Sequence, residues 1–311
     1  MINRVKDRVV GSTTDLFSHG PQPLEHTLNY AGDPGILGPG SVSWRVVGDA
    51  SAFVAGIRAL LVQTAHPEVV AGVENHSRYR SDPLGRLTRT SAYVTATTYG
   101  AGPEVAASVA LVRNAHLEVK GHSVRGKAYS AENPAMTAWV HNVLTDSFLT
   151  AYQSYGRDAL SPQEADQFVL EQTRIGALLD ASPLPTDATS LRSWVCDHAA
   201  IASSAAQRDS IQFLRNPPLP PQVKVGYRLL LKAAIATVPP GIATVVGVQS
   251  GHLDGTVGAA TVRALRWALG SSPAWHVALV RSGAPVPDGM FRQTVRAVAG
   301  ISGVPRTNHR V

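Results

Sequence analysis

The chain has 311 residues, of which 44% are hydrophobic and 16% are charged. This supplies enough apolar material for one large globular domain, or for a domain with a subdomain. The formal net charge is +6, but the Lys and Arg residues are scattered and no helix-turn-helix, zinc-finger or RNA-binding signature occurs, which argues against a nucleic-acid partner. The single cysteine, Cys196, excludes an intrachain disulfide and is typical of a cytoplasmic protein.

Hydrophobic patterning gives no sign of secretion or of a transmembrane helix. Residues 1–8 mix basic and acidic side chains where a secretory signal needs an uninterrupted apolar core. The most hydrophobic long stretch, residues 225–248, is interrupted by Arg228 and Lys232, and the Pro-Pro-Gly run at 239–241 would break a spanning helix. We expect two packed helices there, and peripheral membrane contact is left open.

The domain organisation follows from the distribution of Gly and Pro. Residues 1–40 are expected to form an N-terminal extension with one short helix and a Gly/Pro-rich loop. Residues 41–300 carry helical periodicity and are expected to form one domain, followed by a tail at 301–311. The first helix of that domain is predicted to be capped by Asp49 and ended by Pro67.

A polar pair lies in the next segment, residues 82–90. Arg86 and Thr90 are four residues apart and share one face if this segment is helical. One side chain presents a rigid cationic fork and the other a hydroxyl. This combination suits an anionic cofactor or bound oxygen.

Two consecutive helices are each predicted to carry a histidine on an apolar face. In the first, Pro103 fits the first helical position and Glu104 favours the positive end of the helix dipole. The residues of its inward stripe are Val105, Val109, Val112, His116 and Val119. His116 is thus expected to point into the core, where it serves either as a ligand or as a core histidine bonded to a carbonyl and a hydroxyl.

The second of these helices is predicted to begin after Asn133 as N-cap and to stop at Gly156. The residues that share its inward face are Thr137, His141, Leu144, Phe148 and Tyr152. Two half-buried imidazoles near an Arg/Thr pair are typical of a haem or metal pocket, because imidazole is the commonest nitrogen ligand to iron.

The remaining segments read as structural helices. Ser161-Pro162-Gln163-Glu164 forms a capping box that opens a helix, and proline-rich linkers at 182–186 and 217–221 separate further helices. No stretch shows sustained period-two alternation. The sequence therefore predicts an all-α fold.

Six ordered motifs resemble those of the DUF2236 or MpaB-type oxygenases, a family that includes the catalytic domain of the latex-clearing rubber oxygenases. They are GPGSVSWR at 38–45, LLVQTAHP at 60–67, GVENHS at 72–77, DPLGRLTRT at 82–90, VRNAHLEVKG at 112–121 and WVH at 139–141. The resemblance covers most of the chain.

The resemblance implies an all-helical, DUF2236-like domain that binds one b-type haem without covalent attachment, in agreement with the absence of a Cys-x-x-Cys-His motif. His116 matches the axial histidine. Arg86 and Thr90 match an Arg and a Thr of the family that are four residues apart and precede the histidine, and in this chain we expect them to orient or polarise the oxygen. The implied partners are dioxygen and a hydrophobic small molecule that is lipid-, terpenoid- or aromatic-like.

The chain departs from the rubber oxygenases at two points. Those enzymes have a lysine just before the Thr, able to occupy the distal iron site, whereas this chain has Arg89, and a permanently protonated guanidinium is a poor iron ligand. Their catalytic glutamate has no match here, although Glu68 and Glu74 are nearby in sequence.

Further residues are candidates for the pocket. Arg113 precedes His116 by three residues and would reach a haem propionate or form a surface ion pair. His76 is expected to line the pocket, and His141 to ligate or to line it. His66, before Pro67, is expected to interact as a cationic ring with exposed carbonyls at a helix end, with ligation as the alternative.

These observations favour a haem b-dependent oxidoreductase or oxygenase. The alternative is a haem-binding or gas-sensing protein without turnover, which would bind haem but consume no oxygen. A non-haem iron enzyme is a weaker option because no Glu-x-x-His pair recurs on separate helices. Reaction type, distal iron ligand, substrate and oligomeric state are left open by the sequence.

Overall fold

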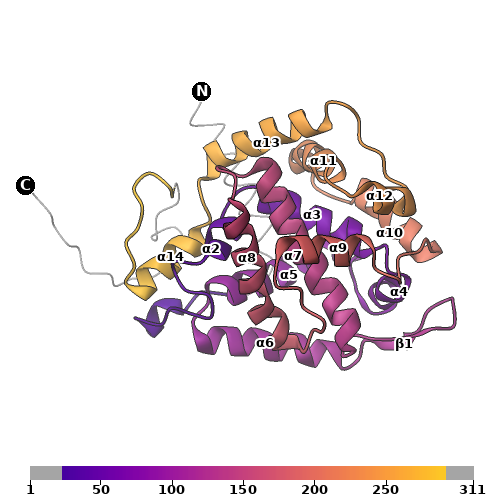
Figure 1. Ribbon diagram of the computed structural model, residues 1–311, viewed down its shortest axis with the longest axis horizontal. Helices are drawn as coiled ribbons and strands as arrows, with labels where there is room; N and C mark the ends of the chain where they lie inside the picture. Colours follow the sequence, from indigo (N-terminus) through magenta and orange to yellow (C-terminus); the bar gives the residue numbers. More distant parts are fainter. Residues whose placement is uncertain (1–22, 292–311) are drawn as a thin grey trace, which may run out of the picture.

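The computed structural model describes residues 23–291, and this part of the chain is helical almost throughout (Figure 1). The prediction of an all-α fold is confirmed. The helices are η1 Thr27–Tyr30, α2 Val42–Val47, α3 Ala52–Gln63, α4 Pro67–His76, α5 Pro83–Tyr99, α6 Gly102–His116, α7 Pro134–Tyr155, α8 Pro162–Gly176, η2 Ala177–Leu179, α9 Ala188–Cys196, α10 Ala205–Arg215, α11 Pro221–Ile235, α12 Pro240–Val246, α13 Asp254–Leu269 and α14 Pro273–Ser282.

One β-hairpin interrupts the helices, between α6 and α7. Strands β1 Lys120–His122 and β2 Ala128–Ser130 pair antiparallel, with Gly121 opposite Tyr129. Figure 1 shows this hairpin projecting from the edge of the molecule. It was not predicted, because a strand of three residues is too short to show alternation.

Helix α7 runs through the middle of the molecule and forms the centre of the core (Figure 1). Thirteen of its 22 residues are buried, among them Trp139, which is fully enclosed and donates from Nε1 to the carbonyl of Gln63 at 3.2 Å. A buried ion pair joins α7 to α3, with Arg58 Nη2 2.7 Å from Asp146 Oδ2. Both charges are paired, as burial in an apolar interior requires.

The predicted caps of two helices are confirmed. Asn133 Oδ1 accepts from the backbone of Ala135 at 3.0 Å, and α7 ends before Gly156. Ser161 Oγ accepts from Glu164 N at 3.2 Å while a Glu164 carboxylate oxygen accepts from Ser161 N at 2.8 Å. These reciprocal bonds satisfy two backbone donors at the start of α8.

The predicted limits of the first long helix were wrong at both ends. Asp49 is not its N-cap: Asp49 Oδ1 accepts from Ser51 N at 2.8 Å, its carboxylate pairs with Arg266, and α3 begins at Ala52. Pro67 does not end this helix but opens the next one, α4. A proline is tolerated at the first helical turn, where its missing N–H is not needed.

The remaining predictions of organisation fall partly within the described residues. The stretch 225–248 contains most of α11 and the whole of α12, divided as predicted before Pro240. Within residues 23–291 no helix combines the length and apolarity needed to cross a bilayer. The first 22 residues of the expected N-terminal extension, and the expected tail at 301–311, lie outside the described part.

Candidate functional site

Helices α5 and α6 form an antiparallel hairpin whose turn end is fixed to the body of the protein. Glu104 accepts from Ala101 N at 2.9 Å and from the Thr27 hydroxyl at 2.7 Å. Arg281 Nη1 donates to the carbonyl of Tyr99 at 2.6 Å. The chain reverses at Gly100, so residues at equal distance from the turn lie at one level.

Three predicted site residues lie on the half of this hairpin that is away from its turn. Arg86 and His116 are each roughly fifteen residues from the turn, and a helix rises about 1.5 Å per residue, so they lie at nearly the same level. Thr90 lies one helical turn along α5 from Arg86.

His116 was predicted to point into the core, but the structure leaves it half-buried. Its stripe faces the body of the protein, but Val105 is the one residue of α6 that is buried, and His116 is half-buried. Helical periodicity identifies the inward face and does not determine whether other elements cover it. The imidazole therefore has solvent access at the end of α6.

The chemistry of His116 suits a ligand. Partial burial lowers the pKa of His116, and the negative charge of Glu132 opposes this shift. The ring is consequently neutral at pH 7, and within residues 23–291 it makes no hydrogen bond. Its ring lone pair is available.

Arg86 is a half-buried cation with few partners. Its Nη1 donates to the hydroxyl of Ser77 at 3.2 Å, and its guanidinium lies over the ring of Tyr79, 5.5 Å from the centroid. It forms no ion pair with any residue in the described range. Burial lowers its pKa, yet a guanidinium remains protonated at every working pH. A positive charge is thus available to an anion.

The two neighbours of Arg86 on α5 differ in exposure and partners. Thr90 is exposed, which leaves its hydroxyl accessible beside the Arg86 face. Arg89, which stands where the rubber oxygenases have a lysine, is also exposed and pairs with Asp82 Oδ2 at 3.2 Å. The structure therefore places Arg89 in a surface ion pair.

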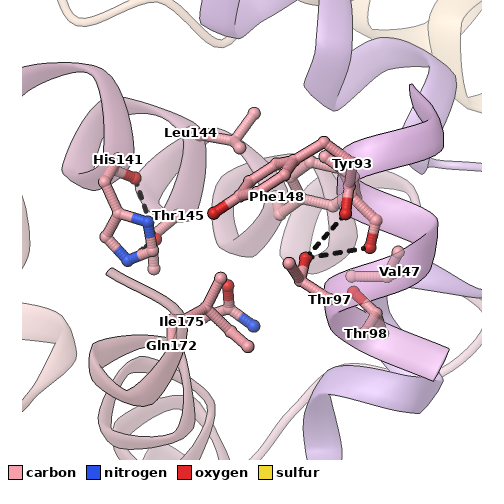
Figure 2. A pocket seen from close by; sticks show the side chains of 11 residues that line it. Val47, Tyr93, Thr97, Thr98, His141, Leu144, Thr145, Phe148, Gln172 and Ile175 are labelled. Carbon is pink, nitrogen blue, oxygen red and sulfur yellow. Dashed lines mark hydrogen bonds between the residues drawn. The ribbon is translucent and has the colours of Figure 1, made fainter. Parts of the chain in front are cut away.

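The face of α5 that carries Arg86 and Thr90 continues inward to a small cavity of about 20 Å³, room for about one water molecule (Figure 2). Helices α5, α7 and α8 supply most of its wall. The lining residues are Val47, Tyr93, Val94, Thr97, Thr98, His141, Leu144, Thr145, Phe148, Gln172 and Ile175. In Figure 2, His141 lies across the cavity from Tyr93 and Thr97.

His141 is a packed histidine between α7 and α8. Its Nε2 lies 3.4 Å from the Thr145 hydroxyl, and the ring also bonds to the backbone of Gln172. A Cβ placed on Gly176 would lie 2.8 Å from the ring, so this glycine allows the close approach of α8. Burial lowers the pKa of His141 to about 4 and keeps it neutral.

Other predicted candidates contact different elements. His76 Nε2 lies 3.2 Å from the hydroxyl of Tyr129, on the β-hairpin. Arg113 is exposed, forms an ion pair with Asp180 at 2.8 Å and donates to the carbonyl of Leu178 at 2.8 Å. The surface ion pair, one of the two alternatives for Arg113, is what the structure shows.

His66 was expected at the carboxyl end of a helix, but it lies at the amino end of the next one. It is the N-cap of α4, where Nδ1 accepts from Val69 N at 3.4 Å. Burial lowers its pKa to about 4, so the ring is neutral and not cationic. The buried carboxylate of Glu68 lies beside it and accepts from the Ser123 hydroxyl at 3.2 Å.

An apolar groove of about 590 Å³ runs along α6, between this helix, η2 and the segment before α2. Its lining residues are Ile36, Gly102, Val105, Ala106, Val109, Ala110, Arg113, Ala177 and Leu178. His116 follows Arg113 by one helical turn on this side of α6. Sequence reasoning missed the groove, because its walls come from segments far apart in the chain.

The described residues thus form an all-α domain in which the neutral, half-buried imidazole of His116 and the guanidinium of Arg86, which has no ion pair among them, lie on the two helices of one hairpin. They contain no group of three or more His, Cys, Asp or Glu residues placed to hold a metal ion. The family whose model matches the chain is described as ER-bound oxygenase mpaB/B'/Rubber oxygenase, catalytic domain, and the match covers residues 44–267. The chain belongs to this family of oxygenase catalytic domains.

The matched range includes the whole α5–α6 hairpin, α7 and the small cavity. A search of curated proteins and a search of solved structures each gave no significant match.

Proposed function

We propose that this protein is a haem b-dependent oxygenase that acts on a hydrophobic substrate, with His116 as the iron ligand. The observation that carries the proposal is the state of that imidazole: neutral, half-buried and without a hydrogen-bond partner among the described residues. A histidine kept only for packing would be expected to resemble His141, whose ring is hydrogen-bonded and packs closely against Gly176 of α8.

The donor set fits a haem. A non-covalent haem needs one protein nitrogen on the iron and cationic or polar partners for its two propionates. His116 supplies the nitrogen, and Arg86, which forms no ion pair among the described residues, supplies a guanidinium; Arg113, three residues before His116, would exchange its ion pair with Asp180 for a propionate. The small cavity beside His141 holds about 20 Å³, which favours a haem position at the open end of the hairpin over one between α7 and α8. When bound, the haem supplies the oxygen chemistry.

Arg86 and Thr90 are proposed to act on the reacting oxygen. Arg86 keeps donors free because, within residues 23–291, the Ser77 hydroxyl is the one group that accepts from it, and Thr90 presents an accessible hydroxyl one turn away. Donors held in place before the reaction stabilise negative charge as it develops, without a cost for reorganising solvent. Arg89 takes no part in ligation, because its guanidinium cannot donate a lone pair.

The groove along α6 supports the hydrophobic substrate class. Its volume of about 590 Å³ lies within the usual range of ligand sites, and Arg113 is the one charged residue of its lining. An apolar molecule in the groove would displace water from the alanine and valine side chains that lead toward His116. Lipid-, terpenoid- and aromatic-like molecules share this requirement.

The proposal is tested by adding hemin to the purified protein and identifying the haem by a pyridine haemochrome assay. Oxygen uptake is then measured with linoleic acid, squalene and naphthalene as a lipid, a terpenoid and an aromatic probe. We expect about one non-covalent haem b per chain and uptake with at least one probe. Failure to bind hemin would contradict the proposal. Haem binding without uptake would favour the alternative, a haem-binding or gas-sensing protein.

A further inference from the structure

Tyr79 lies in the short segment between α4 and α5 and is in contact with two arginines. The side chain is buried, with 7% of its surface exposed. The guanidinium of Arg80 lies 5.1 Å from its ring centroid and that of Arg86 lies 5.5 Å away. Phe213 on α10 meets the ring edge-on at 4.9 Å. The ring is therefore held between three other side chains.

The hydroxyl of Tyr79 is anchored on Glu74, at the end of α4. It donates a very short hydrogen bond to Glu74 Oε1, which also accepts from the Ser210 hydroxyl at 2.7 Å. Burial and the neighbouring Glu74 carboxylate raise the pKa of Tyr79 to about 12, so the phenol stays neutral. Ring and hydroxyl are thus both fixed, the latter across α4 and α10.

The two arginines beside Tyr79 have different hydrogen-bond partners. Arg80 donates from Nη2 to both oxygens of Glu74, at 3.1 and 3.0 Å, and so forms an ion pair with this carboxylate. The guanidinium of Arg86 lies over the face of the Tyr79 ring and donates to the Ser77 hydroxyl. An aromatic face attracts a guanidinium without using its N–H donors, whereas a carboxylate would occupy them.

We propose that Tyr79 is the positioning residue for Arg86. Its anchored ring holds the guanidinium at the open end of the hairpin and leaves the donors free for an anion. The placement of Arg86 stands on these contacts alone, while its use in turnover rests on the proposed function. Two readouts therefore keep the two ideas apart.

The first readout is the NMR signal of the Arg86 side chain in the protein without haem, assigned as the Nε–H signal lost in Arg86→Lys. In the wild type we expect this signal to be displaced by the ring current of Tyr79, with cross-relaxation between Arg86 and the ring protons. Tyr79→Phe keeps the ring and should keep the displacement. Tyr79→Leu should abolish it, and the control Phe213→Leu, which alters the other side of the ring, should retain it.

An Arg86 signal that is unchanged in Tyr79→Leu would overturn the placement. Should this variant not fold, the wild-type cross-relaxation decides alone, because its absence also overturns the placement. That measurement needs only the wild type and the Arg86→Lys variant that assigns the signal.

The second readout is oxygen uptake per bound haem. Tyr79→Leu should lower it about tenfold, since a loosened donor forfeits stabilisation of the transition state. The double variant Tyr79→Leu/Arg86→Ala should be no slower than Arg86→Ala, because both changes remove the same contribution, that of the Arg86 guanidinium, to turnover. Unchanged uptake in Tyr79→Leu would overturn the catalytic consequence. A displaced NMR signal in a protein that consumes no oxygen would uphold the positioning and refute the proposed function.

Discussion

Helices α6 and α7 are adjacent in the chain, each carries a histidine at an inward position, and their packing is opposite. In α7, 13 of 22 residues are buried; in α6, one of 15 is buried. Figure 1 shows α7 in the middle of the molecule and α6 along its edge. A covered helix supplies a rigid frame, whereas a helix face that is left open can receive another molecule.

The two histidines show the consequence of this difference. The ring of His141 contacts α8 and has hydrogen-bond partners, so its nitrogens are engaged. The ring of His116 has none among the described residues. Both are neutral at pH 7 because burial lowers both pKa values. The difference between them is therefore one of hydrogen-bond partners and not of protonation.

The largest expected effect of this contrast is on stability. Trp139→Ala on α7 should lower the free energy of unfolding by about 3–5 kcal/mol, because it removes a fully enclosed indole and leaves a cavity. Leu111→Ala on α6, whose side chain is 72% exposed, should change it by less than about 0.5 kcal/mol. Urea denaturation measures both. Equal losses would show that α6 is covered in solution and would break the comparison.

The second prediction concerns acid stability. The pKa values of His66 and His141 are about 4 in the folded protein against 6.5 for an ordinary histidine, so the unfolded chain binds protons first. Their contribution to stability is complete above pH 6.5 and is lost as the pH falls toward 4. At about 1.4 kcal/mol per pKa unit, each loss is at most about 3 kcal/mol.

The paired variants for this prediction are His66→Asn, which retains a good N-cap residue, and His141→Gln. Each should flatten the dependence of the free energy of unfolding on pH between 6.5 and 4, measured by urea denaturation at several pH values. A dependence as steep as that of the wild type in both variants would contradict the assignment of these two groups.

The third prediction concerns turnover. Arg86→Ala and Thr90→Val should keep haem but lower oxygen uptake per haem, by roughly 10²-fold for a good donor to developing charge. Arg89→Ala is the matched control, because this arginine pairs with Asp82 at the surface, and it should behave as the wild type. Unchanged uptake in both test variants would remove their catalytic role. A destabilised Arg86→Ala with a silent Thr90→Val would assign them to structure.

The sequence predicted helix ends well where the signal is local. Asn133 and Ser161 cap helices through groups two or three residues away, and both were recognised. Asp49 was misassigned because its carboxylate is used by Arg266, 217 positions along the chain. Such a partner leaves no trace in the spacing of nearby residues.

The sequence named candidate residues for the site but could not give their environment. The spacing of Arg86 and Thr90 placed them on one helical face, and the structure adds that the hairpin brings them level with His116. The exposure of α6 and the contacts of Tyr79 with α10 were not predictable, because both depend on which elements pack together. Periodicity identifies the face of a helix and not its neighbour.

The most direct test of the account is hemin binding, followed by absorption spectroscopy, in three alanine variants: His116→Ala, His141→Ala and His76→Ala. An axial ligand acts on the iron itself, whereas a nearby ring only modulates it. We predict that His116→Ala loses the haem or shifts its Soret band most, and that the other two retain a spectrum close to that of the wild type. Abolished binding in His141→Ala with an unaltered His116→Ala would contradict the account and move the site to the covered helix.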